Sequence, residues 1–281
     1  MELVAASKMR KAVASALAAR AYAHASLEVL SSLTEKESEH SQEVPLLQKR
    51  TSGKTLVILI TSNRGLCGAY NARVIKHALG MITANGSKQL VFICIGKKGH
   101  QALARVGANI IASFEDFPEN ITAAHATQVG ELVIETYTQN DIQNVVSIYT
   151  DYESPLAQHA KIQHLLPVDT HTLEDTVESL APEAETSPDE MPSKTTQYIF
   201  EPSPLAVLAH LIERLTHMMI FHHLLESGAS EHSARMIAMK NAKEAAGDMM
   251  QELTLAFNKA RQAGITQEIS EISAGALSMS T

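Results

Sequence analysis

The last third of the sequence predicts one helix that is too long for a compact domain to enclose. From Ser203 to about Ser273 the only proline is Pro204, which directly follows Ser203. Serine is a favoured N-cap and proline fits the first helical position, so this pair predicts a helix start. About 70 helical residues would be roughly 100 Å long, whereas a compact globule of this chain length has a radius of gyration near ~19 Å. We therefore expect the helix to project from the rest of the protein.

The start of the chain predicts a second long helix. Residues 1–43 contain no glycine and no proline, and ten of the first 25 residues are alanine, the best helix former. Apolar residues recur at the three- and four-residue spacing of a coiled-coil seam, interrupted by Arg20: Ala6, Met9, Val13, Ala16, Ala23, Leu27 and Leu30. The terminal helix has a heptad seam of its own, interrupted by Lys243: Met236, Met239, Ala246, Met250, Leu253, Phe257 and Ala260. We expect the two helices to pack on each other as a coiled coil.

The middle of the chain predicts an α/β domain. Runs rich in Val and Ile alternate with helical patterns, and such an order is typical of a mostly parallel sheet covered by helices. The expected strands are Thr55–Ile60, Leu90–Ile95, Ile110–Phe114 and Val145–Tyr149, with two more near Lys161–Leu166 and Gln197–Phe200. The expected helices are Gly68–Ile82, His100–Val106 and Ala123–Tyr137. The predicted segments are a helix in 1–52, the α/β domain in 53–168, an acidic flexible insertion in 169–196, and a strand and long helix in 197–281.

The net charge of −8 is concentrated in one segment. Between Asp169 and Lys194 there are eight acidic residues and one lysine, together with three prolines. This composition is typical of a solvated, mobile insertion. Elsewhere the charge is nearly balanced, and the sequence has no basic patch interleaved with aromatic residues, which argues against a nucleic-acid partner.

The sequence gives no sign of a membrane span or an export signal. The longest apolar runs fall far short of the roughly 20 residues that span a bilayer, and Met1 is followed by Glu2. The two cysteines, Cys67 and Cys94, have neither C-x-x-C nor zinc-ligand spacing, which favours a reduced, cytoplasmic setting.

The strongest candidate for a ligand site is the loop Ser62–Gly68, because phosphates often bind where a strand turns into a helix. The loop lacks the full G-x-G-x-x-G motif. The Gly53–Thr55 tripeptide precedes the strand, and Gln48 stands where a P-loop would begin with glycine. We interpret the loop as a tight turn that packs a helix onto the sheet and Cys67 as a buried structural thiol, with nucleotide binding as the alternative.

No catalytic, metal or cofactor site is predicted. The final helix holds five histidines, at His210, His217, His222, His223 and His232, without the H-E-x-x-H spacing of a helical metal site. His222 and Glu226 are the only pair in that cluster with a histidine at i and a carboxylate at i+4, and we interpret them as an exposed side-chain contact.

Three stretches resemble the gamma subunit of F-type ATP synthase: Val4–Arg10, Ser62–Asn71, and the terminal blocks Glu231–Met236 and Asn258–Ile272. The resemblance covers both ends and the middle, and it leaves only the acidic insertion without a counterpart. It implies a central rotor in which the terminal helices form an antiparallel coiled coil inside a ring of three alpha and three beta subunits. A Rossmann-like α/β domain at its foot would contact the epsilon subunit and the membrane c-ring. ATP chemistry would then take place on the beta subunits, so this chain would need no catalytic residue and no cofactor.

Matched by position, the resemblance implies a role for several residues. Polar contacts with the ring are implied for Arg235, Arg261, Gln262, Thr266 and Glu268, and contacts with acidic loops on beta for Lys8, Arg10 and Lys11. An apolar bearing is implied for Ile265, Ile269 and Ile272, and a structural turn for Arg64, Gly65 and Gly68. The implied location is the cytoplasmic face of a bacterial inner membrane, as a peripheral subunit without bilayer insertion.

One departure from the family concerns the start of the chain. Family members have about two dozen further residues before the segment that matches Met1, and the first residues carry no Ser, Thr, Asp or Asn that could cap a helix. We therefore expect an upstream helical segment and interpret Met1 as an internal methionine. The competing hypothesis for the whole chain is a doubly wound small-molecule or nucleotide-binding enzyme with helical extensions, which would bind its ligand at Ser62–Gly68.

Overall fold

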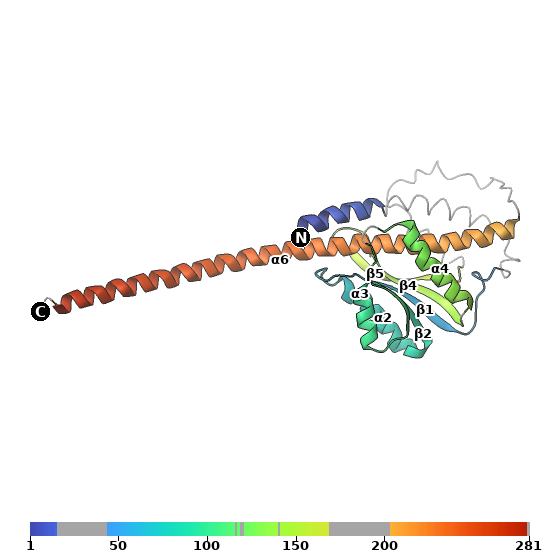
Figure 1. Cartoon of the computed structure of the whole chain (residues 1–281), viewed down its shortest axis with the longest axis horizontal. Helices are drawn as coiled ribbons and strands as arrows, with labels where there is room; N and C mark the ends of the chain where they lie inside the picture. The colour runs from blue at the N-terminus through green and yellow to red at the C-terminus, as the bar shows by residue number, and fades with distance from the viewer. Residues whose placement is uncertain (16–43, 116, 119–120, 140, 169–202, 280–281) are drawn as a thin grey trace. The chain divides into compact units, whose positions relative to one another are not determined.

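The computed structural model describes residues 1–15, 44–115, 117–118, 121–139, 141–168 and 203–279 (Figure 1). The chain forms two compact units, Met1–Met236 and Ile237–Thr281. The expected acidic insertion and the expected strand at Gln197–Phe200 lie outside the described residues. The four segment boundaries expected from the sequence therefore stay predictions.

The first unit contains a five-stranded sheet. Its strands are β1 (Lys54–Ile60), β2 (Leu90–Ile95), β3 (Ile110–Phe114), β4 (Ile142–Tyr152) and β5 (Gln158–Leu166), in the order β3-β2-β1-β4-β5. The first four strands run parallel, and β5 runs antiparallel to β4. This confirms the expected mostly parallel sheet and five of the expected strands, with β4 and β5 longer than expected because they form a hairpin.

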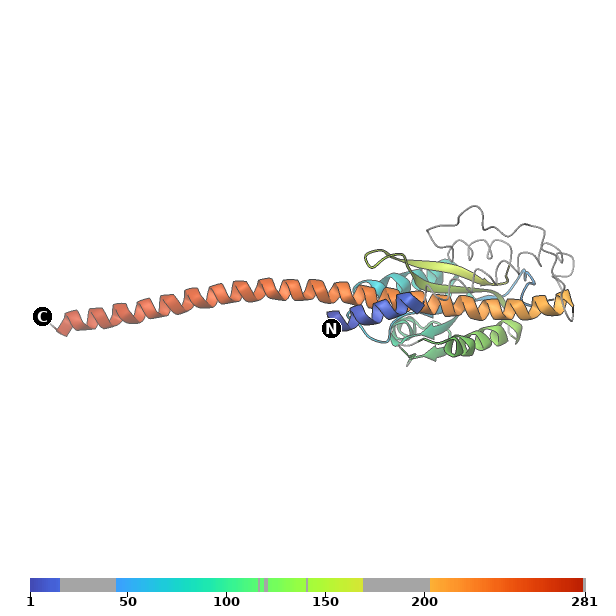
Figure 2. The ribbon, with the colours of Figure 1, turned by 90° about the horizontal axis from the view of Figure 1, so that it is seen from above.

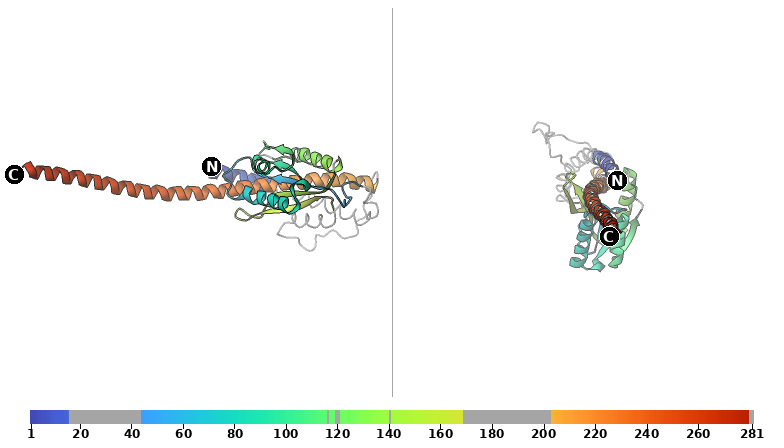
Figure 3. Two further views of the ribbon diagram at one scale, coloured as in Figure 1. Left: turned by 90° about the horizontal axis from the view of Figure 1, so that it is seen from below. Right: turned by 90° about the vertical axis from the view of Figure 1, so that its left-hand side faces the viewer.

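Helices cover both faces of the sheet (Figures 1 and 3). The side chains of β1 alternate between the two faces. Helices α2 (Tyr70–Asn85) and α3 (Lys97–Arg105) pack with Val57 and Leu59 of β1 on one face. Helix α4 (Ala123–Gln139) and the first part of α6 (Pro204–Met279) pack with Leu56 and Ile58 on the other. The short 3-10 helix η2 (Ser87–Gln89) leads into β2. Because both of their faces are buried, the central strands β1 and β2 read as continuous apolar runs.

Helix α6 is a single helix of 76 residues, which confirms the long terminal helix. Ser203 caps it as expected: its hydroxyl oxygen accepts a hydrogen bond from the Ala206 backbone N–H at 3.3 Å. Its first turns belong to the core of the first unit through a stripe of buried side chains at helical spacing: Leu208, Ile212, Leu215, Met219, Ile220 and Leu224. The first part of α6 therefore belongs to the α/β core, and its remaining part, from Ile237, makes up the described residues of the second unit.

Residues 2–15 are helical and pack on α6 in the opposite direction (Figure 2). Ala5 is buried, and the Ser233 hydroxyl donates a hydrogen bond to the Met9 sulfur at 3.2 Å. The expected packing of the first helix against the last is confirmed over these residues. Residues 16–43, the rest of the expected first helix, lie outside the described part of the chain.

A close approach of two loops fixes α3 at the end of the sheet. Gly96, at the end of β2, has φ +93°, and a Cβ atom there would lie 2.1 Å from the Thr61 carbonyl oxygen. Three residues later the Gly99 backbone N–H donates to the Thr61 hydroxyl oxygen at 2.8 Å. The two glycines therefore let the start of α3 contact the end of β1 directly, a requirement that the sequence patterns did not identify.

Candidate functional site

The loop after β1 is closed by its own side chains. The Ser62 backbone N–H donates to Asn71 Oδ1 at 3.0 Å, and Asn71 Nδ2 donates to Ser62 Oγ at 2.7 Å and to Cys67 Sγ at 3.2 Å. The Ser62 hydroxyl in turn donates to the Arg64 carbonyl oxygen at 2.6 Å. These bonds tie the first turn of α2 to the end of β1, as expected for a tight turn that packs a helix onto the sheet.

The backbone of the loop enters the left-handed region at two residues. Gly68 has φ +56°, which glycine adopts without strain, and Leu66 has φ +63° although it carries a side chain. Leu66 is 64% exposed, so the turn presents an apolar tip. Among the three expected turn residues, Gly68 is the one with a positive φ.

Both cysteines are buried free thiols, which confirms the interpretation of Cys67 as a buried thiol. Burial raises the pKa of Cys94 to about 12. Because the thiolate is the reactive form, we expect Cys94 of the folded chain to resist iodoacetamide at about pH 8, where an exposed cysteine reacts readily. Mass spectrometry with and without denaturant measures the reaction at each cysteine. Rapid native labelling of Cys94 would contradict the burial described here.

Helix α6 places Arg235 against this loop, and Glu231 and His232 lie beside Arg235 on the same helix. Arg235 Nη2 lies 2.6 Å from Glu231 Oε1, and Arg235 Nη1 lies 3.3 Å from His232 Nδ1. Arg235 also donates to the Gly65 carbonyl oxygen at 3.4 Å, through Nε and through Nη2. The Arg235 side chain is only 16% exposed, because it holds the loop against α6. Its implied contact with a surrounding ring stays a prediction.

A cavity of about 340 Å³ lies between the loop and α6. It is lined from three sides by the β1 loop, the segment after β3, and α6, including Asn63, Tyr70, Phe117 and Glu231. Burial, and then the negative charge of Glu231, raise the pKa of Tyr70 well above 10. The Tyr70 hydroxyl therefore stays protonated.

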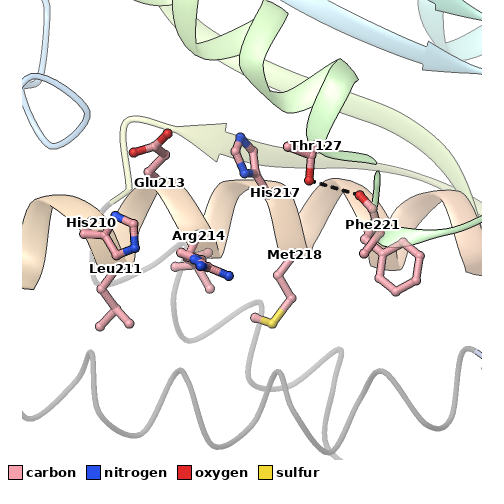
Figure 4. A pocket seen from close by; sticks show the side chains of 10 residues that line it. Thr127, His210, Leu211, Glu213, Arg214, His217, Met218 and Phe221 are labelled. Carbon is pink, nitrogen blue, oxygen red and sulfur yellow. Dashed lines mark hydrogen bonds between the residues drawn. The ribbon is translucent and has the colours of Figure 1, made fainter. Parts of the chain in front are cut away.

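A second hollow of about 670 Å³ is lined mostly by side chains of α6, together with Ala123 and Thr127 of α4 (Figure 4). Glu213 and His217 point toward α4, whereas Leu211 and Met218 point to the other side of α6. His217 packs so closely on α4 that a Cβ atom at Gly130 would lie 2.1 Å from its ring. Burial lowers the pKa of His217, so at neutral pH the hollow is lined by a neutral imidazole. Across the described residues, no cluster of three His, Cys, Asp or Glu side chains could hold a metal ion.

The interpretation of His222 and Glu226 as an exposed pair is wrong. Their side chains are only 4% and 1% exposed, with His222 Nε2 3.0 Å from Glu226 Oε1. Sequence spacing identified the contact but not its burial, because the sheet packs against this side of α6.

The far part of α6 presents the implied ring-contact residues. Arg261, Gln262, Thr266 and Glu268 are all exposed. Ile265, Ile269 and Ile272 are 49%, 58% and 73% exposed. At about 100° per helical residue these three isoleucines fall within about 60° of one another. We call them the isoleucine stripe.

The remaining implied contacts lie on residues 2–15. Arg10 and Lys11 are exposed, and Lys8 is half-buried.

On the second unit, the apolar seam residues Met250, Leu253 and Phe257 are 67%, 63% and 68% exposed. Large side chains exposed at this spacing are typical of a surface that another protein covers. None of the described helices is long and apolar enough to cross a membrane.

Comparisons with known proteins extend over nearly the whole chain. The family model described as ATP synthase matches residues 1–279. The ATP synthase gamma chain of Heliobacterium modesticaldum is 37% identical over 279 residues, which cover 99% of this chain and 92% of the relative. The gamma chain of Chlorobaculum parvum is 34% identical over 282 residues, covering 98% and 90% of the two chains.

Solved structures share the fold. A chain of the central stalk and c-ring structure of Tetrahymena thermophila mitochondrial ATP synthase has a TM-score of 0.62 and 24% identity, covering 86% of this chain and 97% of that one. A chain of the Euglena gracilis mitochondrial ATP synthase, in the structure of OSCP, F1 and c-ring, has a TM-score of 0.58 and 16% identity, covering 99% and 94%.

Proposed function

Because the chain belongs to the family of ATP synthase gamma chains, we propose that it is the central rotor shaft of a proton-translocating ATP synthase. The observation that carries the mechanism is the continuity of α6. One uninterrupted helix is packed into the α/β core at its start and carries exposed polar and apolar side chains along residues 240–275. A helix of this kind can transmit rotation between a foot domain and a surrounding ring.

The shaft acts by being asymmetric. ATP synthesis takes place on the beta subunits, and this chain is the non-catalytic subunit that makes three identical sites differ. A conformational cycle needs contacts that differ between states, and a symmetric ring obtains them only from an asymmetric partner. The family membership therefore favours the rotor over the alternative hypothesis of a nucleotide-binding enzyme.

The proposed partners follow the exposed surfaces. The isoleucine stripe would turn in an apolar bearing of the ring, flanked by Arg261 and Glu268 on one side and by Gln262 and Thr266 on the other. Lys8, Arg10 and Lys11 would contact acidic loops of beta. The α/β domain would contact the epsilon subunit and the c-ring, at the cytoplasmic face of a bacterial inner membrane.

The direct test is affinity purification of the tagged chain from its own cells. We expect alpha and beta subunits to co-purify in equal amounts, at a threefold excess over this chain. Recovery of the chain without these subunits would contradict the rotor function.

A thermal-shift measurement with ATP or NAD tests the loop Ser62–Gly68 separately, and we expect no shift of the melting temperature.

A double substitution tests the polar contacts. Arg261→Ala with Gln262→Ala removes hydrogen bonds that typically contribute about 1.5 to 3 kcal/mol when one partner is charged. We expect coupled ATP synthesis in membrane vesicles to fall about tenfold or more, with assembly intact, because both side chains are exposed in the chain itself. Unchanged synthesis would show that these residues make no productive contact.

A further inference from the structure

The side of α6 that packs on the sheet changes from apolar to polar along the helix. Ile212 and Met219 belong to the apolar core. Further along, three side chains form hydrogen bonds with the β4–β5 hairpin: His223, Ser227 and Ser230. At about 100° per helical residue, all of these positions lie within about 80° of one another. The three polar side chains are buried, and we call them the polar row.

His223 is held through both of its ring nitrogens. Nδ1 lies 2.8 Å from Ser147 Oγ on β4, and Nε2 lies 3.0 Å from Gln163 Oε1 on β5. The Tyr149 hydroxyl also donates to Gln163 Oε1, at 2.9 Å, so this oxygen is an acceptor and we assign the ring proton to Nε2. Nδ1 then accepts from the Ser147 hydroxyl. Burial lowers the pKa of His223 well below 6.5, which keeps the ring neutral.

The ring of His223 is also fixed from its flat side. It stacks on the Tyr149 ring, with the two centroids 4.0 Å apart and the two planes at 17° to each other. One side chain of α6 therefore contacts both strands of the hairpin, in two different directions.

Ser227 and Ser230 bind the backbone of β4. The Thr150 backbone N–H donates to Ser227 Oγ, and the Ser230 hydroxyl donates to the Thr150 carbonyl oxygen, each at 3.3 Å. The last pair between β1 and β4 joins Leu59 with Ile148, which precedes Thr150. Helix α6 therefore supplies hydrogen-bond partners to β4 beyond the point where β1 ends.

Hydrogen bonds fix the position of a helix more sharply than apolar packing does. Hydrophobic burial is non-directional, so an apolar stripe keeps much of its stabilisation when the helix slips or turns. Hydrogen bonds depend steeply on angle and distance, and a buried polar group that loses its partner is destabilising. A slip of α6 by one turn, about 5.4 Å, would leave every member of the polar row opposite the wrong group.

We propose that the polar row sets the register of α6 on the sheet, with His223 as its principal positioning residue. The row fixes the position of α6 along its own axis and the side of the helix that faces the hairpin. Because α6 is one continuous helix, a slip at the row would displace the residues that follow it. The value of this register for coupling rests on the proposed rotor function, whereas the register itself is a property of the isolated chain.

Double electron–electron resonance between two spin labels on the full-length chain measures the register. The labels are attached at Glu213→Cys on α6 and His159→Cys on β5, both exposed positions of the first unit. The two native cysteines are buried, and the chain without introduced cysteines controls for their labelling. We expect one narrow distance distribution when the polar row is intact.

His223→Phe keeps an aromatic ring on Tyr149 but loses both ring hydrogen bonds. We expect the distance to shift or broaden by about 1 to 5 Å, the range between a small helix shift and a one-turn slip. His223→Gln keeps a side-chain donor and acceptor, so its distance should stay closer to wild type.

Ile212→Ala is the matched control, because Ile212 is fully buried on the same side of α6. The loss of its apolar side chain should lower the melting temperature without moving the distance. In membrane vesicles, the ratio of ATP synthesis to ATP hydrolysis should fall severalfold in His223→Phe and stay near wild type in Ile212→Ala. A change of stability alone would not separate these two variants.

If His223→Phe does not fold, Ser227→Ala with Ser230→Ala tests the same row, because alanine favours the helix, and we expect a shift in the same range. An unchanged distance in the variants of the row would overturn the proposal. So would an equal shift in Ile212→Ala, because the polar row would then have no specific effect. The distances are measured on the chain alone, so their failure leaves the co-purification test of the rotor unaffected.

Discussion

Gly96→Ala is expected to lower the free energy of unfolding of the chain by about 3 to 5 kcal/mol. Gly96 has φ +93° and ψ 141°, a region that only glycine adopts readily, and the new Cβ atom would lie 2.1 Å from the Thr61 carbonyl oxygen. That oxygen belongs to the backbone at the end of β1, so it cannot rotate away as a side chain would. Relief requires α3 to move away from β1. Thermal unfolding followed by circular dichroism measures the loss, which should be roughly 10 °C in melting temperature.

Gly80→Ala is the control for this substitution. Gly80 is exposed within α2, has no neighbour within 4 Å of the Cβ position, and has no positive φ. Alanine there should stabilise the chain by up to about 1 kcal/mol, because it favours the helix. Equal melting temperatures for the two variants would mean that the contact between Gly96 and Thr61 is looser than described.

Ile269→Asp is expected to abolish coupled ATP synthesis without destabilising the isolated chain. Ile269 is 58% exposed, and exposed substitutions usually change stability by less than about 0.5 kcal/mol. If the isoleucine stripe turns in an apolar bearing, the new carboxylate is buried there without a partner, at a cost of about 3 to 5 kcal/mol. Because 1.4 kcal/mol corresponds to about tenfold, synthesis in membrane vesicles should fall about a hundredfold or more.

Ile269→Leu separates the apolar contact from other effects of the substitution. Leucine keeps the apolar surface and nearly the same volume, so we expect near-normal synthesis. The melting temperature of the isolated chain should be the same for both variants. Normal synthesis with Ile269→Asp would place the bearing elsewhere on α6.

The sheet and its helices could be predicted because their signals are local. The run Leu90–Ile95 forms β2 with the expected bounds, since a strand buried on both faces is apolar at every position. The capping pair Ser203–Pro204 likewise set the start of α6. In such cases the residues that define an element lie next to one another in the chain.

Contacts between distant segments could not be predicted in the same way. Arg50 lies in a polar stretch, yet its Nη1 donates to the carbonyl oxygens of Tyr137 and Ile142, each at 2.8 Å, and its guanidinium stacks on the Tyr137 ring. Glu226 looks like a surface residue in sequence because its burial depends on β4. Leu66 gives no sign of a positive φ, which the packing of its loop imposes. Each of these features depends on partners that the local pattern does not contain.

The position of α6 in the core also sets an order of events during synthesis of the chain. All five described strands have been translated once Leu166 is reached, but the apolar face that holds Leu56 and Ile58 still lacks the side chains from Leu208 to Leu224. At about 5 to 20 residues per second the ribosome needs several seconds to supply them. Helix α4 covers only part of this face, so the rest of it stays exposed until α6 is made. The nascent chain is therefore a natural client for chaperones that bind apolar surface. The shaft helix completes the domain that it later turns with.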